Sequence, residues 1–178
     1  MRIENTLVGI VTEQFRKYSE WTATTSVHKS REEAIMCCLL GMVGELSEYL
    51  EVTEEEDFAE KSRAELGDIL WYIGHFVYRI GVIDEISISR SYDILNDGVS
   101  NIGRLAELSK KVIRDSDFDF KASPKYGEIL KTIGRIVGSI WNECSDNNWD
   151  FIELMEENVA KLESRKERNV LQGSGDDR

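Results

Sequence analysis

Four carboxylates stand in two pairs with helical spacing. Glu45 lies three residues before Glu48, and Glu65 lies three residues before Asp68, so each pair occupies one face of a helix. A short acidic turn at 53–57 separates the pairs and predicts that the two helices fold back antiparallel. In such a hairpin Glu45 and Asp68 lie at one level. Glu48 and Glu65 lie at the next level, so the four carboxylates converge.

Converging carboxylates repel one another strongly unless a cation lies between them. Hard oxygen ligands suit Mg²⁺ or Mn²⁺, and Mg²⁺ commonly joins protein carboxylates to substrate phosphates. Gly44 and Gly67 crowd these carboxylates with small residues, which argues against the alternative of a solvated acidic face. A di-iron bundle site is excluded, because neither histidine of the chain follows a glutamate by three residues. His75 is therefore expected as an ordinary helix residue.

The last expected helix carries Asn158, Lys161 and Arg165 on one face. A lysine and an arginine on one face neutralise phosphate oxygens, and the arginine does so through two parallel hydrogen bonds. Pairing with neighbouring glutamates on the surface explains the same spacing, and spacing alone favours that alternative. Trp71 and Tyr72 offer rings for stacking on a base, although aromatic residues at helical spacing more often belong to the core.

Composition narrows the classes of partner. The chain has 178 residues, enough for one domain, and 22 Lys and Arg against 34 Asp and Glu give a net charge of −12. That balance argues against a nucleic-acid polymer or an anionic membrane as partner. The sequence shows no signal-peptide pattern and no apolar run of membrane-spanning length, so the expected location is cytoplasmic. Three cysteines without a Cys-x-x-Cys pair predict neither disulfides nor a zinc site.

Hydrophobic periodicity and a single proline favour an all-α helical bundle. Helices are expected at about 4–20, 31–53, 57–81, 92–115, 124–145 and 149–168. Three starts carry capping signals, namely Ser30-x-x-Glu33, Asp57-x-x-Glu60 and Ser123-Pro124. We expect 1–170 to form a single domain, followed by a polar tail at 171–178.

The chain also contains a degenerate internal repeat. Residues 65–80 align without gaps with residues 125–140 and share seven identities. The segment 92–145 is therefore interpreted as a second copy of the hairpin 31–81, although chance similarity between amphipathic helices is an alternative. The four carboxylates correspond in this copy to Glu107, Lys110, Lys125 and Glu128. Two glutamates and two lysines satisfy one another, so no metal is expected there.

Three segments resemble the motifs of MazG-type pyrophosphohydrolases. They are GMVGELSE at 41–48, ELGDILWY at 65–72 and NVAKLESR at 158–165. These enzymes belong to the all-α NTP pyrophosphatase superfamily, whose other members include dimeric dUTPases and phosphoribosyl-ATP pyrophosphohydrolases. The resemblance implies a Mg²⁺-dependent enzyme that cleaves (d)NTP to (d)NMP and pyrophosphate, with Mn²⁺ as a substitute for Mg²⁺.

The resemblance also implies roles for individual residues. The catalytic metal would be bound by Glu45, Glu48, Glu65 and Asp68. The substrate would be bound by Lys161 and Arg165 at its phosphates, by Asn158 near the sugar or phosphates, and by Trp71. Gly44 stands where MazG proteins often have a further glutamate, which leaves the number of metals open.

The assembly and the activity each have an alternative. Small family members lack the middle segment of about 86–148, so the chain is expected either as a homodimer or as a pseudo-dimeric monomer. In the second case, 92–145 replaces the hairpin of a partner subunit. A non-catalytic nucleotide-binding or regulatory helical protein on the same scaffold is the alternative function. The phosphate-facing helix is expected at 149–168 in either case.

Overall fold

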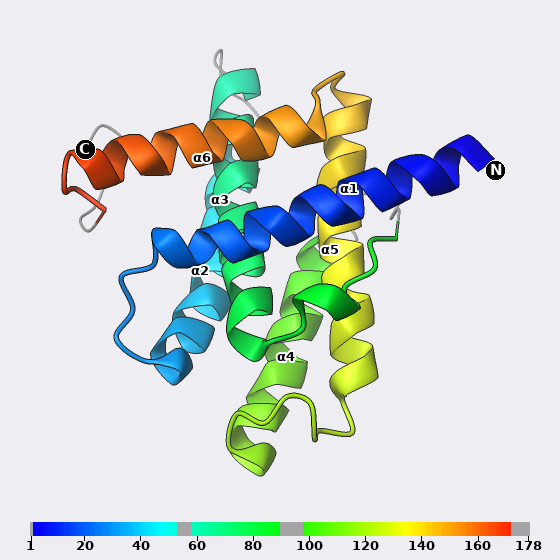
Figure 1. Ribbon diagram of the computed structural model, residues 1–178, viewed down its shortest axis with the longest axis vertical. Helices are drawn as coiled ribbons and strands as arrows, with labels where there is room; N and C mark the ends of the chain where they lie inside the picture. The colour runs from blue at the N-terminus through cyan, green and yellow to red at the C-terminus, as the bar shows by residue number, and fades with distance from the viewer. Residues whose placement is uncertain (1, 53–57, 90–97, 172–178) are drawn as a thin grey trace.

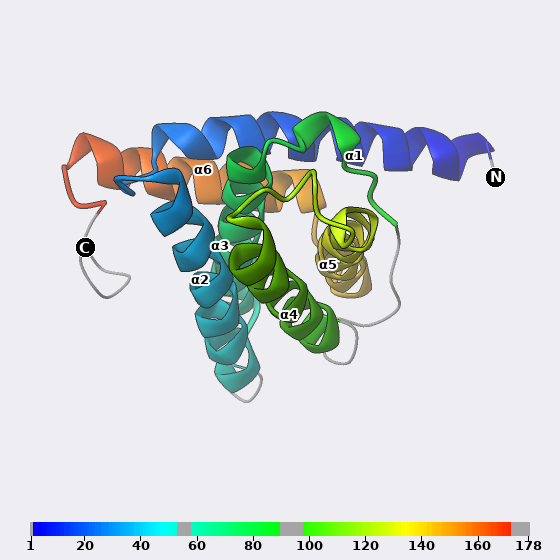
Figure 2. The same cartoon turned by 90° about the horizontal axis from the view of Figure 1, so that it is seen from below.

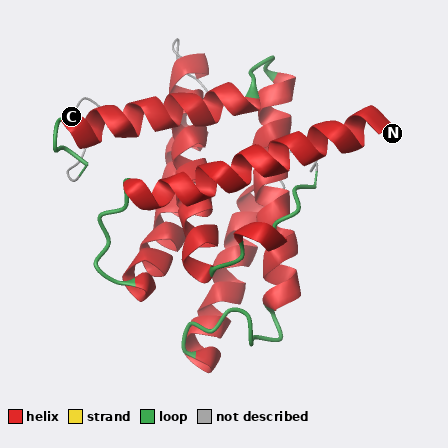
Figure 3. Cartoon of the chain, in the orientation of Figure 1, coloured by secondary structure: helices red, strands yellow, loops and turns green. Residues whose placement is uncertain are grey.

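The structure is a computed structural model that describes residues 2–52, 58–89 and 98–171. Within these ranges the chain forms helices and loops without strands (Figure 3), so the all-α prediction is confirmed. The elements are α1 (Arg2–Trp21), η1 (Thr22–Thr24), α2 (Arg31–Val52), α3 (Phe58–Ile80), η2 (Ile83–Glu85), α4 (Val99–Ser116), α5 (Tyr126–Asp146) and α6 (Phe151–Glu167).

Four helices form two hairpins, and two further helices lie across them. α2 packs along α3, and α4 packs along α5, while contacts of α2 with α4 and of α3 with α5 join the two hairpins. Figures 1 and 2 show α1 and α6 side by side across one face of this four-helix layer, running in roughly the same direction. Both crossing helices contact α3, which therefore packs against α1, α2, α5 and α6.

The start of α2 is capped almost as its sequence predicts. Ser30 Oγ accepts a hydrogen bond from the Glu33 N–H at 3.0 Å. The Glu33 carboxylate accepts from the N–H of Lys29 at 3.1 Å, one residue before the expected donor. One backbone donor of the first turn and one just before the helix are thus satisfied. The second predicted capping box begins at Asp57, which lies outside the described residues.

The predicted Ser123-Pro124 start of α5 is wrong. The Ser123 carbonyl accepts from the Tyr126 N–H at 3.0 Å, and the Ser123 hydroxyl accepts from the Lys125 N–H at 3.2 Å. These two bonds close a turn, so the helix begins only at Tyr126. α4 is described from Val99 onward, and the predicted start at 92 falls outside the described residues.

α6 begins two residues later than predicted, because Asp150 caps it. The Asp150 carboxylate accepts from the Ile152 N–H at 2.7 Å and from the Glu153 N–H at 3.3 Å. This contact fixes the first turn of the helix that carries Asn158, Lys161 and Arg165.

One hydrophobic core joins both hairpins with α1 and α6. Several positions that are identical in 65–80 and 125–140 are buried in both helices, namely Ile69/Ile129, Ile73/Ile133, Val77/Val137 and Ile80/Ile140. Facing the same core accounts for this part of the similarity, and common descent of the two hairpins stays a prediction. No helix in the described ranges combines the length and apolarity that crossing a membrane requires.

Candidate metal centre

Three of the four predicted carboxylates gather between α2 and α3. Glu45 of α2 and Glu65 and Asp68 of α3 each offer an oxygen, and these oxygens lie within 4.8 Å of one another. We call these three residues the carboxylate group. Glu65 is buried, with 8% of its surface exposed, while Glu45 and Asp68 are half-buried. Glu48 is exposed and does not belong to the group, whereas Glu65 is hydrogen-bonded to Glu45.

Crowding in the carboxylate group changes the acidity of Glu45. Burial is the largest cause, and the negative charges of Asp68 and Glu65 add to it, so the pKa of Glu45 rises to about 8. Glu48 contributes in the same direction, which places its charge within electrostatic reach. A cation between these carboxylates would offset both burial and repulsion.

The chemistry of the donors fits a hard divalent cation. All three side chains offer carboxylate oxygens, the ligands that Mg²⁺ and Mn²⁺ prefer over nitrogen or sulfur. Elsewhere in the described ranges, no three His, Cys, Asp or Glu side chains come together in this way. Gly44, however, gives no support to a crowded site, because a Cβ placed there would meet no atom within 4 Å.

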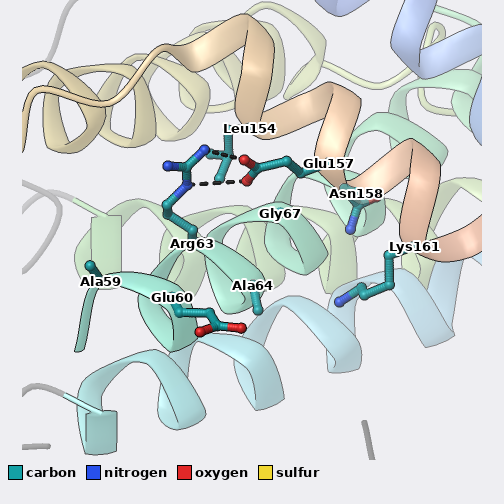
Figure 4. A pocket seen from close by; sticks show the side chains of 9 residues that line it. All are labelled: Ala59, Glu60, Arg63, Ala64, Gly67, Leu154, Glu157, Asn158 and Lys161. Atoms are coloured by element: carbon teal, nitrogen blue, oxygen red, sulfur yellow. Dashed lines mark hydrogen bonds and ion pairs between the residues drawn. The ribbon is translucent and has the colours of Figure 1, made fainter. Parts of the chain in front are cut away.

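α6 provides two polar contacts to the Asp68 carboxylate. Asn158 Nδ2 donates to Oδ1 at 2.7 Å, and Lys161 Nζ donates to Oδ2 at 2.6 Å. Figure 4 shows both side chains projecting from α6 toward α3, with Asn158 next to Gly67. A Cβ at position 67 would lie 3.2 Å from Asn158, so the glycine permits this close approach. Asn158 and Lys161 therefore contact one member of the carboxylate group, Asp68.

Trp71 and Arg165 lie beside the carboxylate group in a cavity of about 310 Å³, which we call the aromatic cavity. Its lining comprises Thr25, Val27, His28, Cys37, Glu45, Asp68, Trp71, Tyr72, Leu162, Arg165 and Leu171. Arg165 is 4% exposed. Trp71 is half-buried, and its Nε1–H donates to Thr25 Oγ1 at 2.9 Å, which orients the ring. Two of the four residues predicted to bind substrate, Trp71 and Arg165, thus share a cavity with the carboxylates of Glu45 and Asp68.

A larger cavity of about 490 Å³ lies between α3 and α6 (Figure 4). Asn158 and Lys161 line it, so the Lys161–Asp68 ion pair connects the linings of both cavities. On the far side, Arg63 forms two hydrogen bonds with Glu157. Arg63 and Glu157 of this cavity are therefore engaged with each other, and Lys161 is engaged with Asp68.

His75 belongs to the packing of α3, as expected for a histidine without a metal. It is fully buried, and its Nε2 accepts from Arg79 Nε at 3.1 Å. Its Nδ1 lies 3.1 Å from Thr22 Oγ1, and the Trp71 ring stacks on it at 5.1 Å between centroids. Burial and the Arg79 charge lower the pKa of His75 to about 3, so the imidazole stays neutral.

Tyr18 of α1 reaches the centre, although no motif marked it. Its hydroxyl donates to Asn158 Oδ1 at 2.7 Å. The sequence offers one weak signal, because Tyr18 continues an apolar stripe through Val11 and Phe15 at helical spacing. That signal predicts burial and gives no hint of a polar contact to a residue 140 positions away.

The second hairpin carries balanced charges where the first has carboxylates. Glu107 forms ion pairs with Lys110 and Lys111 of its own helix, so one part of the predicted balance of two glutamates and two lysines is observed. Glu128 pairs with Arg104, which reaches across from α4. The repeat predicted Lys125 as a partner of Glu128. Lys125 is near enough to help lower the pKa of Glu128, but the ion-pair partner of Glu128 is Arg104.

Comparison with known proteins identifies a phage protein as similar. The Gene 37 protein of Mycobacterium phage L5 is 29% identical over 80 residues, which make up 45% of this chain and 69% of that protein. Its name states no activity or ligand. No protein family matches the chain, and no solved structure matches it.

Proposed function

We propose that this chain is a Mg²⁺-dependent nucleoside triphosphate pyrophosphohydrolase that cleaves (d)NTP to (d)NMP and pyrophosphate. One observation carries the proposal: three carboxylates meet within 4.8 Å, and Lys161 contacts one of them. The resemblance of 41–48, 65–72 and 158–165 to MazG-type motifs supports it, because these segments contain the residues that meet at the centre.

In the proposed enzyme, Glu45, Glu65 and Asp68 would hold Mg²⁺. The bound ion supplies positive charge against the phosphate oxygens. Lys161 brings a second positive charge to the Asp68 side of the group, where its Nζ lies 2.6 Å from Oδ2. Arg165 brings a third from the wall of the aromatic cavity. Lys161 and Arg165 bind the triphosphate through charge-assisted hydrogen bonds.

The aromatic cavity receives the nucleoside in this proposal. Trp71, Tyr72 and His28 line it next to Glu45 and Asp68. The Trp71 and Tyr72 rings meet edge to face at 5.1 Å between centroids, and both rings line the cavity, where a planar base would stack. Stacking accepts every base, so the proposal commits to no base preference.

Glu48 is the proposed general base. Its carboxylate is exposed and lies beside the carboxylate group without belonging to it. Water attacks the α-phosphorus, and the bond between that phosphorus and the αβ-bridging oxygen breaks. Pyrophosphate leaves with the bonding electrons, and Glu48 accepts the proton of the water.

A panel of dNTPs and NTPs tests the proposal, with and without Mg²⁺. We expect pyrophosphate release that depends on Mg²⁺. Binding of nucleotides without release would support the alternative of a non-catalytic nucleotide-binding or regulatory protein. If the protein neither binds nucleotides nor releases pyrophosphate, a purely structural helical bundle is the remaining alternative. The proposal applies both to a homodimer and to a pseudo-dimeric monomer.

A further inference from the structure

A chain of hydrogen bonds runs from α1 through α6 to Asp68 on α3. The Tyr18 hydroxyl donates to Asn158 Oδ1 at 2.7 Å, and Asn158 Nδ2 donates to Asp68 Oδ1 at 2.7 Å. Tyr18 and Asn158 are 5% and 3% exposed, so water does not compete for these bonds. We propose that Tyr18 is a positioning residue that fixes Asp68 for metal binding through Asn158. The inference rests on the proposed function, because it assumes that Asp68 binds the ion.

The polarity of each group gives the chain its direction. A carboxylate only accepts hydrogen bonds, so the NH₂ end of Asn158 must face Asp68. The Oδ1 end then points into the buried interior, where it needs a donor. Tyr18 provides that donor, and burial together with the negative charge of Asp68 holds the pKa of its hydroxyl well above the usual value. The tyrosine therefore keeps its proton.

Asn158 also differs from Lys161 in what it does during the proposed reaction. Both side chains contact Asp68, each at a different oxygen. Lys161 is assigned to the phosphates, so its ammonium group is expected to move from Asp68 to the phosphates when a nucleotide binds. Asn158 is expected to keep its position, because both ends of its amide form hydrogen bonds within the protein. The Tyr18–Asn158 pair is thus the contact that orients Asp68 throughout.

The packing of α1 against α6 fixes the position of Tyr18. Its ring stacks on Trp21 at 5.6 Å between centroids, and Trp21 Nε1–H donates to Glu163 Oε1 of α6 at 3.0 Å. Gly67 lets Asn158 approach α3, as described above. A tyrosine on a helix without a motif therefore belongs to the support of the centre.

Calorimetric titration with Mn²⁺ tests the inference directly, with far-UV circular dichroism confirming the fold of each variant. We expect Tyr18→Phe to weaken Mn²⁺ binding about tenfold, within the range for residues that orient metal ligands. Tyr126→Phe is the matched control, because Tyr126 contacts Glu85 and lies on neither α1 nor α6. Its affinity for Mn²⁺ should equal that of the unaltered protein.

A double-variant cycle shows whether Tyr18 acts through Asn158. Tyr18→Phe combined with Asn158→Ala should bind Mn²⁺ no more weakly than Asn158→Ala alone. Additive losses, or unchanged binding by a folded Tyr18→Phe variant, would overturn the inference and leave the proposed function intact. Absence of Mn²⁺ binding by the unaltered protein would overturn both.

Discussion

Burial and the neighbouring carboxylates raise the pKa of Glu45, and this shift leads to a prediction about stability. The folded pKa is about 8, and an isolated glutamate has a value of 4.5. Between these values the folded chain keeps a proton that the unfolded chain releases. Without divalent cations, the free energy of unfolding should therefore fall as the pH rises from about 4.5 to about 8.

Urea unfolding across this pH range checks the prediction. Glu45→Gln cannot release the proton, so its stability should depend less on pH. Glu51→Gln, an exposed position on the same helix, should keep the original slope. Added Mg²⁺ should stabilise the protein most at the high end of the range, because the ion displaces the proton. An identical slope in Glu45→Gln would show that this carboxyl is not the group responsible.

Glu48 separates catalysis from metal binding. As the proposed general base it would contribute to turnover, while Glu45, Glu65 and Asp68 are the proposed ligands of the ion. Glu48→Gln should lower kcat by a factor of about 10² to 10⁴, the usual contribution of general base catalysis. Mn²⁺ affinity, measured by calorimetry, should fall far less than kcat, since Glu48 lies outside the carboxylate group. Loss of Mn²⁺ binding in this variant would make Glu48 a metal ligand instead.

Sequence spacing predicted most of this centre at the residue scale. Glu45, Glu65 and Asp68 meet as the hairpin geometry requires, since helical period and antiparallel folding determine which levels face each other. The position of Glu48 could not be predicted, because the level of a residue does not tell how far its helix is rotated. Tyr18 could not be predicted either, because its polar contact depends on how α1 crosses α6.

At the scale of elements, a close crossing fixes α5 against the segment that follows η2. A Cβ at Gly134 would lie 2.2 Å from the carbonyl oxygen of Ser87, and the Ser89 N–H donates to the Gly134 carbonyl at 3.3 Å. Backbone atoms on both sides leave little freedom to move apart. Gly134→Ala should therefore destabilise the fold by about 1–3 kcal/mol, as overpacking does.

Gly127 offers the matched control on the same helix. A Cβ there would meet nothing within 4 Å, so alanine should be neutral or stabilising by up to about 1 kcal/mol through its helix propensity. Urea denaturation of both variants measures the difference. Equal stabilities would mean that the segment carrying Ser87 does not press on α5.

The sequence predicted that these elements exist, while some of their boundaries depended on contacts it does not show. Hydrophobic periodicity placed every described α-helix, because burial of one face is a local pattern, but it did not predict the short 3-10 helices η1 and η2. The start of α5 was missed, because Ser123 uses its carbonyl and hydroxyl to close a turn instead of capping a helix. The Asp150 cap of α6 has the Asp-x-x-Glu pattern and was available in the sequence.

At the scale of the whole molecule, the two hairpins have different electrostatics. The first gathers three carboxylates, whereas the second pairs Glu107 and Glu128 with basic side chains. We therefore predict that Mn²⁺ binds only to the first hairpin. Calorimetry should show loss of binding in Glu65→Gln and unchanged binding in Glu128→Gln. Reduced binding in Glu128→Gln would assign a metal to the second hairpin.

The arrangement of the hairpins beneath α1 and α6 is the part that sequence patterns left open (Figure 2). Amphipathic stripes show that each helix has a buried face but not which helix covers it. The arrangement decides the chemistry, since α6 reaches Asp68 from outside the α2–α3 hairpin. Only this crossing brings Asn158 and Lys161 to the carboxylates that the hairpin gathers.

The central claim is that the carboxylate group cleaves a triphosphate between its α- and β-phosphates. Phosphorus NMR of a nucleoside triphosphate incubated with Mg²⁺ tests it most directly, with the unaltered protein and Glu65→Gln side by side. We predict monophosphate and pyrophosphate from the unaltered protein and intact triphosphate with Glu65→Gln. Diphosphate and phosphate as products, or undiminished pyrophosphate from a folded Glu65→Gln variant, would contradict the claim.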